Sequence, residues 1–165
     1  LAINVSALQL NNPQFGQELQ TFMRHYELSP SFVELELTES AIMENFTLAC
    51  DLLHELSTEG FSLAIDDFGT GYSSLAHLSR LPAGILKLDK SLIDDLESSL
   101  TTQTMLENII RMAHDLDKIV VVEGVESAEQ LQILKRLGCD QAQGFYLSRP
   151  LSESDFEKLV FEVKE

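Results

Sequence analysis

Short apolar runs alternate with longer segments of helical spacing along the whole chain. The runs are LAINV (1–5), FVELELT (32–38), FSLAID (61–66), GILKLD (84–89), IVVVEGV (119–125) and CDQAQG (139–144). Strands that alternate with helices are typical of parallel βαβ units, so the pattern predicts an α/β fold with about six units. Six units fit either an open doubly wound sheet or most of an eight-unit barrel, and periodicity alone does not choose between them.

The segments between the runs carry signals that start and stop helices. Asn12 followed by Pro13 predicts an N-cap with proline in the first turn, and Ser127 with Gln130 predicts a capping box. Glycine predicts the end of two helices, at Gly60 and Gly138. These signals and the apolar spacing predict helices over about 12–26, 46–59, 101–117, 127–138 and 153–163. In the third of these, the expected buried face is Met105, Ile109, Met112, Ala113 and Leu116.

A polar residue stands at or near the end of every apolar run. These residues are Asn4, Glu36, Asp66 with Asp67, Lys87, Glu123 and Gln143, at successive intervals of 32, 30, 21, 36 and 20 residues. The carboxyl ends of parallel strands line the active sites of α/β folds, and in a barrel they meet at one mouth. A single polar residue of this kind is usually a helix cap, but six in register favour a common site.

The chemistry of this set points to hard divalent cations. Asn4, Glu36, Asp66, Asp67 and Glu123 offer only oxygen ligands, which favours Mg²⁺, Mn²⁺ or Ca²⁺ and argues against zinc. One carboxylate of an adjacent aspartate pair can bridge two cations ~3.5–4 Å apart, a geometry that suits phosphodiester cleavage. Beside such cations Lys87 would have a lowered pKa and could take or orient a proton of the attacking water.

The segment DDFGTGYSSL (66–75) combines two of these ligands with flexible backbone. Gly69 and Gly71 permit unusual backbone angles, and Ser73 or Ser74 is expected to cap a following helix. A loop of this kind can close over a substrate and couple substrate binding to assembly of the metal site.

Composition and charge limit which ligands and which cellular compartment are expected. The formal net charge is −16, and the 11 Lys and Arg residues form no cluster, so a nucleic-acid polymer is not an expected partner. An acidic protein still handles a phosphate ester when a divalent metal lies between them. Cys50 and Cys139 are expected to be buried packing residues and predict a reducing, cytoplasmic setting. No apolar run reaches the ~18 residues of a membrane span.

Six motifs together, in this order and spacing, resemble the EAL-domain cyclic di-GMP phosphodiesterases of bacteria. They are NVS (4–6), ELTES (36–40), DDFGTGYSSL (66–75), KLDKSLI (87–93), VVEGVES (121–127) and QGFYLSRPL (143–151). The resemblance implies a partial TIM-like (β/α)8 barrel that hydrolyses cyclic di-GMP to linear pGpG with two Mg²⁺ or Mn²⁺ ions. The all-oxygen ligand set by itself predicts that Ca²⁺ supports binding with little turnover and is inhibitory, because Ca²⁺ is larger, looser in geometry and weaker at acidifying water.

Roles for individual residues follow from the same resemblance. Asn4, Glu36 and Asp66 are expected to hold the first metal, with Asp66 bridging to a second held by Asp67 and Glu123. Lys87 is the expected catalytic lysine, and Gln143 its partner in holding the catalytic water. Glu39 is expected to anchor the 66–75 loop, and Glu126 to lie behind the ligands. No substrate-binding residue is assigned.

The resemblance also sets expectations about the rest of the protein. Residues 1–165 correspond to the C-terminal two-thirds of one EAL-type barrel domain, so the first two elements and the E-x-L-x-R signature are expected to precede them. Upstream regulatory domains, a membrane anchor outside this chain and a homodimer or oligomer are further expectations. Two alternatives stay open, an inactive cyclic di-GMP receptor and a scaffold for protein partners.

Overall fold

The computed structural model describes residues 1–70 and 75–162 and places one parallel sheet at their centre. Its strands are β1 (Ala2–Asn4), β2 (Glu34–Thr38), β3 (Ser62–Phe68), β4 (Ile85–Leu88), β5 (Ile119–Val122) and β6 (Gln141–Ala142). The α-helices are α1 (Ala7–Leu10), α2 (Phe15–His25), α3 (Glu39–Glu44), α4 (Phe46–Thr58), α5 (Leu75–Leu78), α6 (Leu100–Asp115), α7 (Ala128–Arg136) and α8 (Glu153–Glu162). Two 3-10 turns, η1 (Pro30–Phe32) and η2 (Lys90–Leu92), complete the set. The predicted α/β class with six parallel units is confirmed.

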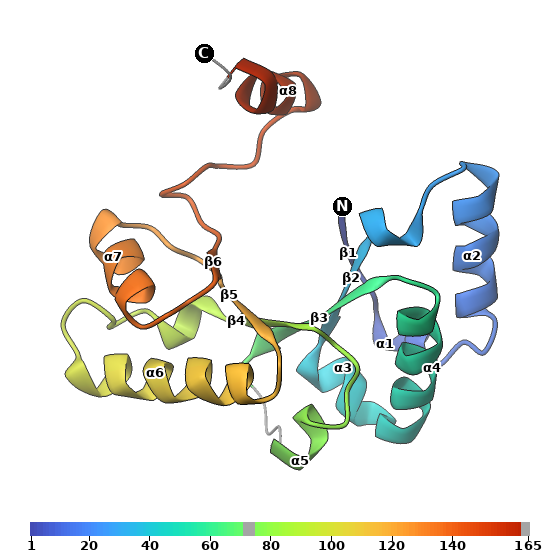
Figure 1. Cartoon of the computed structure of the whole chain (residues 1–165), viewed down its shortest axis with the longest axis horizontal. Coiled ribbons are helices and arrows are strands. Elements are labelled where there is room, and N and C mark those ends of the chain that lie inside the picture. The colour runs from blue at the N-terminus through green and yellow to red at the C-terminus, as the bar shows by residue number, and fades with distance from the viewer. Residues whose placement is uncertain (71–74, 163–165) are drawn as a thin grey trace.

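The order of the strands decides between the two architectures that periodicity left open, in favour of the barrel that the motif resemblance predicted. The six strands lie in the sheet in chain order, from β1 to β6, and every neighbouring pair is parallel. A doubly wound sheet reverses this order at a switch point, whereas a barrel winds in one direction throughout. The sheet is therefore wound as in a barrel, and it stays open between β1 and β6 in the described part of the chain (Figure 1).

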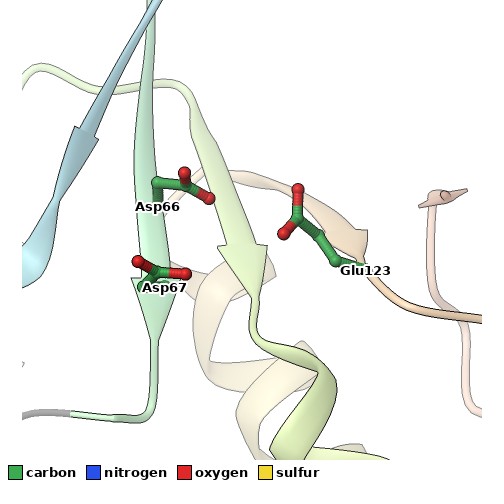
Figure 2. Close-up of side chains that lie close together, drawn as sticks. All are labelled: Asp66, Asp67 and Glu123. Atoms are coloured by element: carbon green, nitrogen blue, oxygen red, sulfur yellow. The ribbon is translucent and has the colours of Figure 1, made fainter. Parts of the chain in front are cut away.

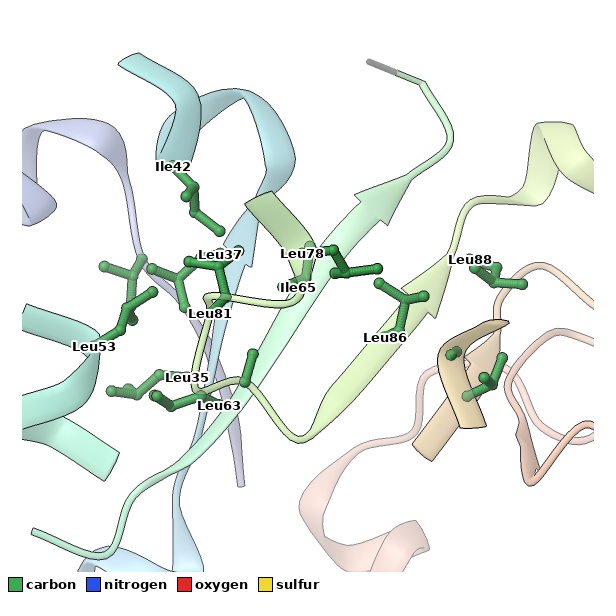
Figure 3. Packing of buried hydrophobic residues seen from close by; sticks show 14 of the residues in the cluster. Leu35, Leu37, Ile42, Leu53, Leu63, Ile65, Leu78, Leu81, Leu86 and Leu88 are labelled. Carbon is green, nitrogen blue, oxygen red and sulfur yellow. The ribbon is translucent and has the colours of Figure 1, made fainter. Parts of the chain in front are cut away.

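A two-residue alternation along the strands separates the core from the polar face of the sheet. Leu35 and Leu37 of β2, Leu63 and Ile65 of β3, and Leu86 and Leu88 of β4 are almost completely buried. They pack with helix residues such as Ile42 and Leu53 (Figure 3). Because successive side chains of a strand point to opposite faces, Glu36, Asp66 and Lys87 fall on the other face.

Several predicted helix signals are confirmed in detail. Ser127 and Gln130 form the predicted capping box of α7, and Gly138 follows the helix with φ 84°. Gly60 ends the turn after α4 with φ 97°. α8 follows an extended segment and stands away from the sheet in Figure 1, with Phe156, Leu159, Val160 and Phe161 exposed.

One expectation about the start of a helix is wrong, and two expectations about burial are right only in part. Helix α2 begins at Phe15, because the Asn12 side chain accepts the Gln14 N–H at 3.0 Å and closes a local turn before the helix. The predicted face of α6 is partly right: Ala113 is buried and Ile109, Met112 and Leu116 pack partly buried against the core. Met105 is 40% exposed, and the other fully buried residues are Leu106 and Ile110. Cys50 is buried as expected, but Cys139 is only partly buried.

Within residues 1–70 and 75–162, no helix combines the length and apolar content that a bilayer span requires.

Gly144 allows the chain after β6 to lie directly against the chain after β5. A Cβ placed on Gly144 would lie 2.1 Å from the Val125 carbonyl oxygen and 2.2 Å from its amide nitrogen. The Val125 amide also donates to the Gln143 carbonyl at 3.0 Å. A methyl group at this position therefore cannot be accommodated without moving one of the two segments.

We expect Gly144→Ala to lower the free energy of unfolding by roughly 1–3 kcal/mol, as overpacking does elsewhere. Gly84→Ala is the matched control, because a Cβ at Gly84 would meet nothing within 4 Å. Urea denaturation of both variants checks this prediction. Equal stability of the two variants would contradict the steric argument.

Candidate active site

The ammonium of Lys87 lies among carboxylates from three neighbouring strands. Its Nζ is 2.6 Å from Glu36 Oε1, 2.6 Å from Glu123 Oε1 and 3.4 Å from Asp66 Oδ1. Only 6% of the Lys87 side chain is exposed, and Glu36 and Asp66 are largely buried as well. Four of the residues predicted at strand ends are therefore brought together.

Asp67 reaches the same site through an irregularity in β3. Strict alternation would send Asp66 and Asp67 to opposite faces of the sheet. Ile65 pairs with Leu86, but Phe68 pairs with Leu88, so β3 contains one more residue than β4 over this stretch. Asp67 has φ 54°, in the left-handed region that non-glycine residues seldom adopt. This bulge is the local feature that brings both aspartates to one side.

Asp66, Asp67 and Glu123 form the acidic part of the site (Figure 2). One carboxylate oxygen from each residue lies within 4.8 Å of the other two. In Figure 2 the Glu123 side chain extends from the end of β5 toward the two aspartates of β3. Three carboxylates at this separation can share a cation.

Burial and like charges shape the protonation of the cluster. Burial raises the pKa of Asp67, and the nearby carboxylates of Asp66 and Asp89 raise it further. Burial by itself lowers the pKa of Lys87, but hydrogen bonds to Glu123 and Glu36 outweigh it, so the net pKa is raised. The lowered pKa predicted for Lys87 requires bound cations and stays a prediction.

The donor set fits a hard divalent cation. The Asp66 Oδ1 atom is buried and has no hydrogen-bond partner among the described residues, although Lys87 Nζ is 3.4 Å away. An ionised oxygen that is desolvated and incompletely paired is costly, and a cation would satisfy it. Every ligand on offer is oxygen, which suits Mg²⁺ or Mn²⁺.

Asn4 and Gln143 lie on the two outermost strand ends of the sheet, on either side of the Lys87 cluster. Asn4 pairs with Glu36 in the register of β1 and β2. Gln143 follows β6, and its backbone N–H donates to the Val122 carbonyl at 2.8 Å, next to Glu123. Both residues are exposed, and their roles stay predictions.

Glu39 and Glu126 lie outside the cluster. Glu39 is 3% exposed at the start of α3, and its Oε1 atom finds no hydrogen-bond partner within the described ranges. Gly71, Ser73 and Ser74, the loop residues singled out in the sequence, lie outside the described residues, so the anchoring role of Glu39 stays a prediction. Glu126 is exposed and accepts a hydrogen bond from Lys90 Nζ at 2.6 Å.

Two features of the site were missed in the sequence. Glu34 lies two residues before Glu36 on the same face of β2, and burial raises its pKa, with the Glu36 charge adding to the effect. The alternation E-L-E-L at 34–37 was a signal that could have identified it. The second is a hollow of about 360 Å³ beside Gln143, where the Arg149 guanidinium lies 4.5 Å from the centre of the Phe145 ring.

Comparison with known sequences relates this geometry to a described family. Residues 1–150 match the sequence profile of the EAL domain. The cyclic di-GMP phosphodiesterase NbdA of Pseudomonas aeruginosa is 41% identical over 160 residues, which cover 97% of this chain and 20% of NbdA. The chain thus spans about a fifth of the length of this curated relative.

Solved structures give the same relationship. The MucR phosphodiesterase of Pseudomonas aeruginosa in complex with c-di-GMP matches with a TM-score of 0.88 and 38% identity, over 94% of this chain and 63% of that one. BlrP1 of Klebsiella pneumoniae, solved with manganese and cy-diGMP, matches with a TM-score of 0.84 and 36% identity, over 91% of this chain and 38% of that one. BlrP1 has also been solved with calcium and cy-diGMP.

The ion network makes a prediction about stability that is independent of catalysis. Lys87→Met should lower the free energy of unfolding by roughly 3–5 kcal/mol in EDTA, because it leaves buried carboxylates without a counter-charge. Added Mg²⁺ should restore part of this loss.

Urea denaturation in EDTA and in Mg²⁺ measures both effects. Lys158→Met is the control, because Lys158 forms an exposed pair with Asp155 at 3.2 Å and its replacement should matter little. If Lys87→Met and Lys158→Met were equally stable in EDTA, the role of Lys87 as the buried counter-charge would be disproved.

Proposed function

This chain belongs to the EAL domain family, and we propose that it supplies metal-binding and catalytic residues of a phosphodiesterase that converts cyclic di-GMP to linear pGpG. The observation that carries the proposal is the convergence of Glu36, Asp66 and Glu123 around Lys87 at the ends of adjacent strands. The names of NbdA and of the MucR complex support the choice of substrate.

The oxygen ligands divide between two cation positions in this proposal. Asn4, Glu36 and Asp66 would hold the first, and Asp66, Asp67 and Glu123 would hold the second. Two such cations, when bound, polarise the phosphodiester and acidify the attacking water. The site prefers Mg²⁺ or Mn²⁺ for turnover, because Ca²⁺ accepts the same ligands but is larger and looser in geometry.

The remaining residues handle the proton and the substrate. Lys87 holds or moves the proton of the attacking water at its Nζ atom, and the Gln143 amide orients that water. The hollow beside Gln143 offers the Phe145 ring to a guanine base and the Arg149 guanidinium to a phosphate or a base edge. This hollow takes one half of the dinucleotide.

The wider protein is also part of the proposal. The chain spans about a fifth of NbdA, so we propose regulatory domains outside it, a cytoplasmic location for the domain, and assembly as a homodimer or oligomer. The ligand is a cyclic dinucleotide and not a nucleic-acid polymer, in keeping with the net charge of −16.

We expect a protein that contains this domain intact to hydrolyse cyclic di-GMP in Mg²⁺ or Mn²⁺ and to be inactive in EDTA. Ca²⁺ should support ligand binding with little turnover, because it acidifies water weakly. Product chromatography under each condition, with calorimetry of ligand binding in Ca²⁺, tests this. Undiminished turnover in EDTA, or equal turnover in Ca²⁺ and Mg²⁺, would disprove the proposed metal chemistry.

Lys87→Ala in the same protein should lower kcat by ~10²-fold or more and leave ligand affinity within a few-fold, because proton transfer is a transition-state role. Asp66→Ala should be at least as damaging, since it removes the ligand shared by both cations. Lys158→Ala, on the exposed face of α8, is the control with wild-type kinetics. If Lys87→Ala changed KM alone, Lys87 would be a phosphate-binding residue instead.

A further inference from the structure

The η2 turn follows β4 and lies between the two strands that carry the acidic cluster. β4 pairs with β3 on one side and with β5 on the other, so the chain leaving β4 passes between the ends of both. The Asp89 side chain caps the turn by accepting the Ser91 N–H at 2.9 Å. The turn is thus a fixed element placed between Asp67 and Glu123.

One side of the turn packs against the segment that follows Asp67. Gly69 has φ 103°, and a Cβ placed on it would lie 2.7 Å from Leu92 Cδ1. Leu92 therefore fills the space in which a side chain at position 69 would stand. Between Asp67 and Gly69, the backbone is tied to the same region by the Asp89 N–H, which donates to the Phe68 carbonyl at 3.3 Å.

The other side of the turn packs against the segment that follows Glu123. Gly124 has φ 72°, and a Cβ placed on it would lie 2.6 Å from both Cβ and Cγ of Lys90. The Lys90 stem then continues to its ammonium, which donates to Glu126 Oε1 at 2.6 Å. Lys90 thus contacts the chain on either side of Val125 and holds the turn that begins at Glu123.

We propose that η2 is a spacer that sets the separation of the Asp66–Asp67 pair from Glu123, with Leu92 and Lys90 as positioning residues for the metal ligands. The inference rests on the proposed metal-dependent function. The distances from ligand atoms to a metal ion must stay within about 0.2 Å of their preferred values. Loss of the Leu92–Gly69 contact or of the Lys90–Gly124 contact would therefore weaken the metal site. The Lys90–Glu126 ion pair is exposed and contributes little by itself, so most of the effect comes from the Lys90 stem against Gly124.

Mn²⁺ binding to a protein that contains this domain intact tests the proposal without any turnover. Lys90→Ala removes the stem and the charge and should weaken Mn²⁺ affinity by about 10-fold, as loss of a group behind metal ligands does elsewhere. Lys90→Met and Glu126→Gln keep an aliphatic side chain at position 90 and remove only the ion pair. The Mn²⁺ affinity of these two variants should fall by no more than about 3-fold. Lys90→Arg should retain wild-type affinity, as should the control Lys158→Ala.

Calorimetric Mn²⁺ titration, paired with a thermal melt in EDTA, distinguishes positioning from stability. The proposal requires that Lys90→Ala bind Mn²⁺ more weakly while its melting temperature in EDTA stays at the wild-type value. Unchanged affinity in Lys90→Ala, or a fall in affinity matched by a lower melting temperature, would overturn it. Failure of the wild-type protein with the intact domain to bind Mn²⁺ would overturn the metal-dependent function, and this inference with it.

Discussion

The ammonium of Lys87 supplies the charge on which the centre of the sheet depends. Glu36, Asp66 and Glu123 surround it from three strands, and together they bring three negative charges against one positive charge when ionised. Two negative charges are left unbalanced, and Asp67 adds another at its edge. Buried charges of one sign are costly, so the arrangement gains stability from any cation that joins it. The proposed metal binding would therefore be linked to the integrity of the sheet through the same four side chains.

The same two-residue alternation produces both the core and the site. Along β2, leucines at 35 and 37 enter the core while Glu34 and Glu36 face away from it. β3 and β4 repeat the pattern, with Ile65 and Leu86 in the core and Asp66 and Lys87 opposite. Tight packing on one face fixes the position of the backbone, and the polar side chains on the other face take their precision from it. A one-residue register shift in β2, β3 or β4 would remove a polar side chain from the site and apolar side chains from the core together.

The sequence predicted the features that follow from periodicity and missed those that depend on local backbone geometry. Spacing along the chain was enough to place Glu36, Asp66, Lys87 and Glu123 at neighbouring strand ends, because parallel units return each strand end to the same edge. Periodicity did not predict the strand order, since both architectures share one pattern, and it was the family resemblance that predicted the winding of a barrel. The bulge at Asp67 and the early turn at Asn12 were missed because each depends on a backbone conformation that no residue type specifies. The packing of Lys90 on Gly124 joins residues 34 positions apart and leaves no periodic signal.

The negative charge of the site constrains how it can take an anionic ligand. A phosphodiester that approached Asp66, Asp67 and Glu123 without cations would meet three carboxylates and a single ammonium already paired with them. Coulomb repulsion at such short range is strong where water is partly excluded. In the proposed function, divalent cations held by these carboxylates would reverse the sign of the field that a phosphate meets, and they would compete with Lys87 for the carboxylate oxygens. Under the proposed function, the Lys87 Nζ atom would be available to a water at the phosphate once cations balance the carboxylates, so one residue would serve first as counter-charge and then as proton-handling group.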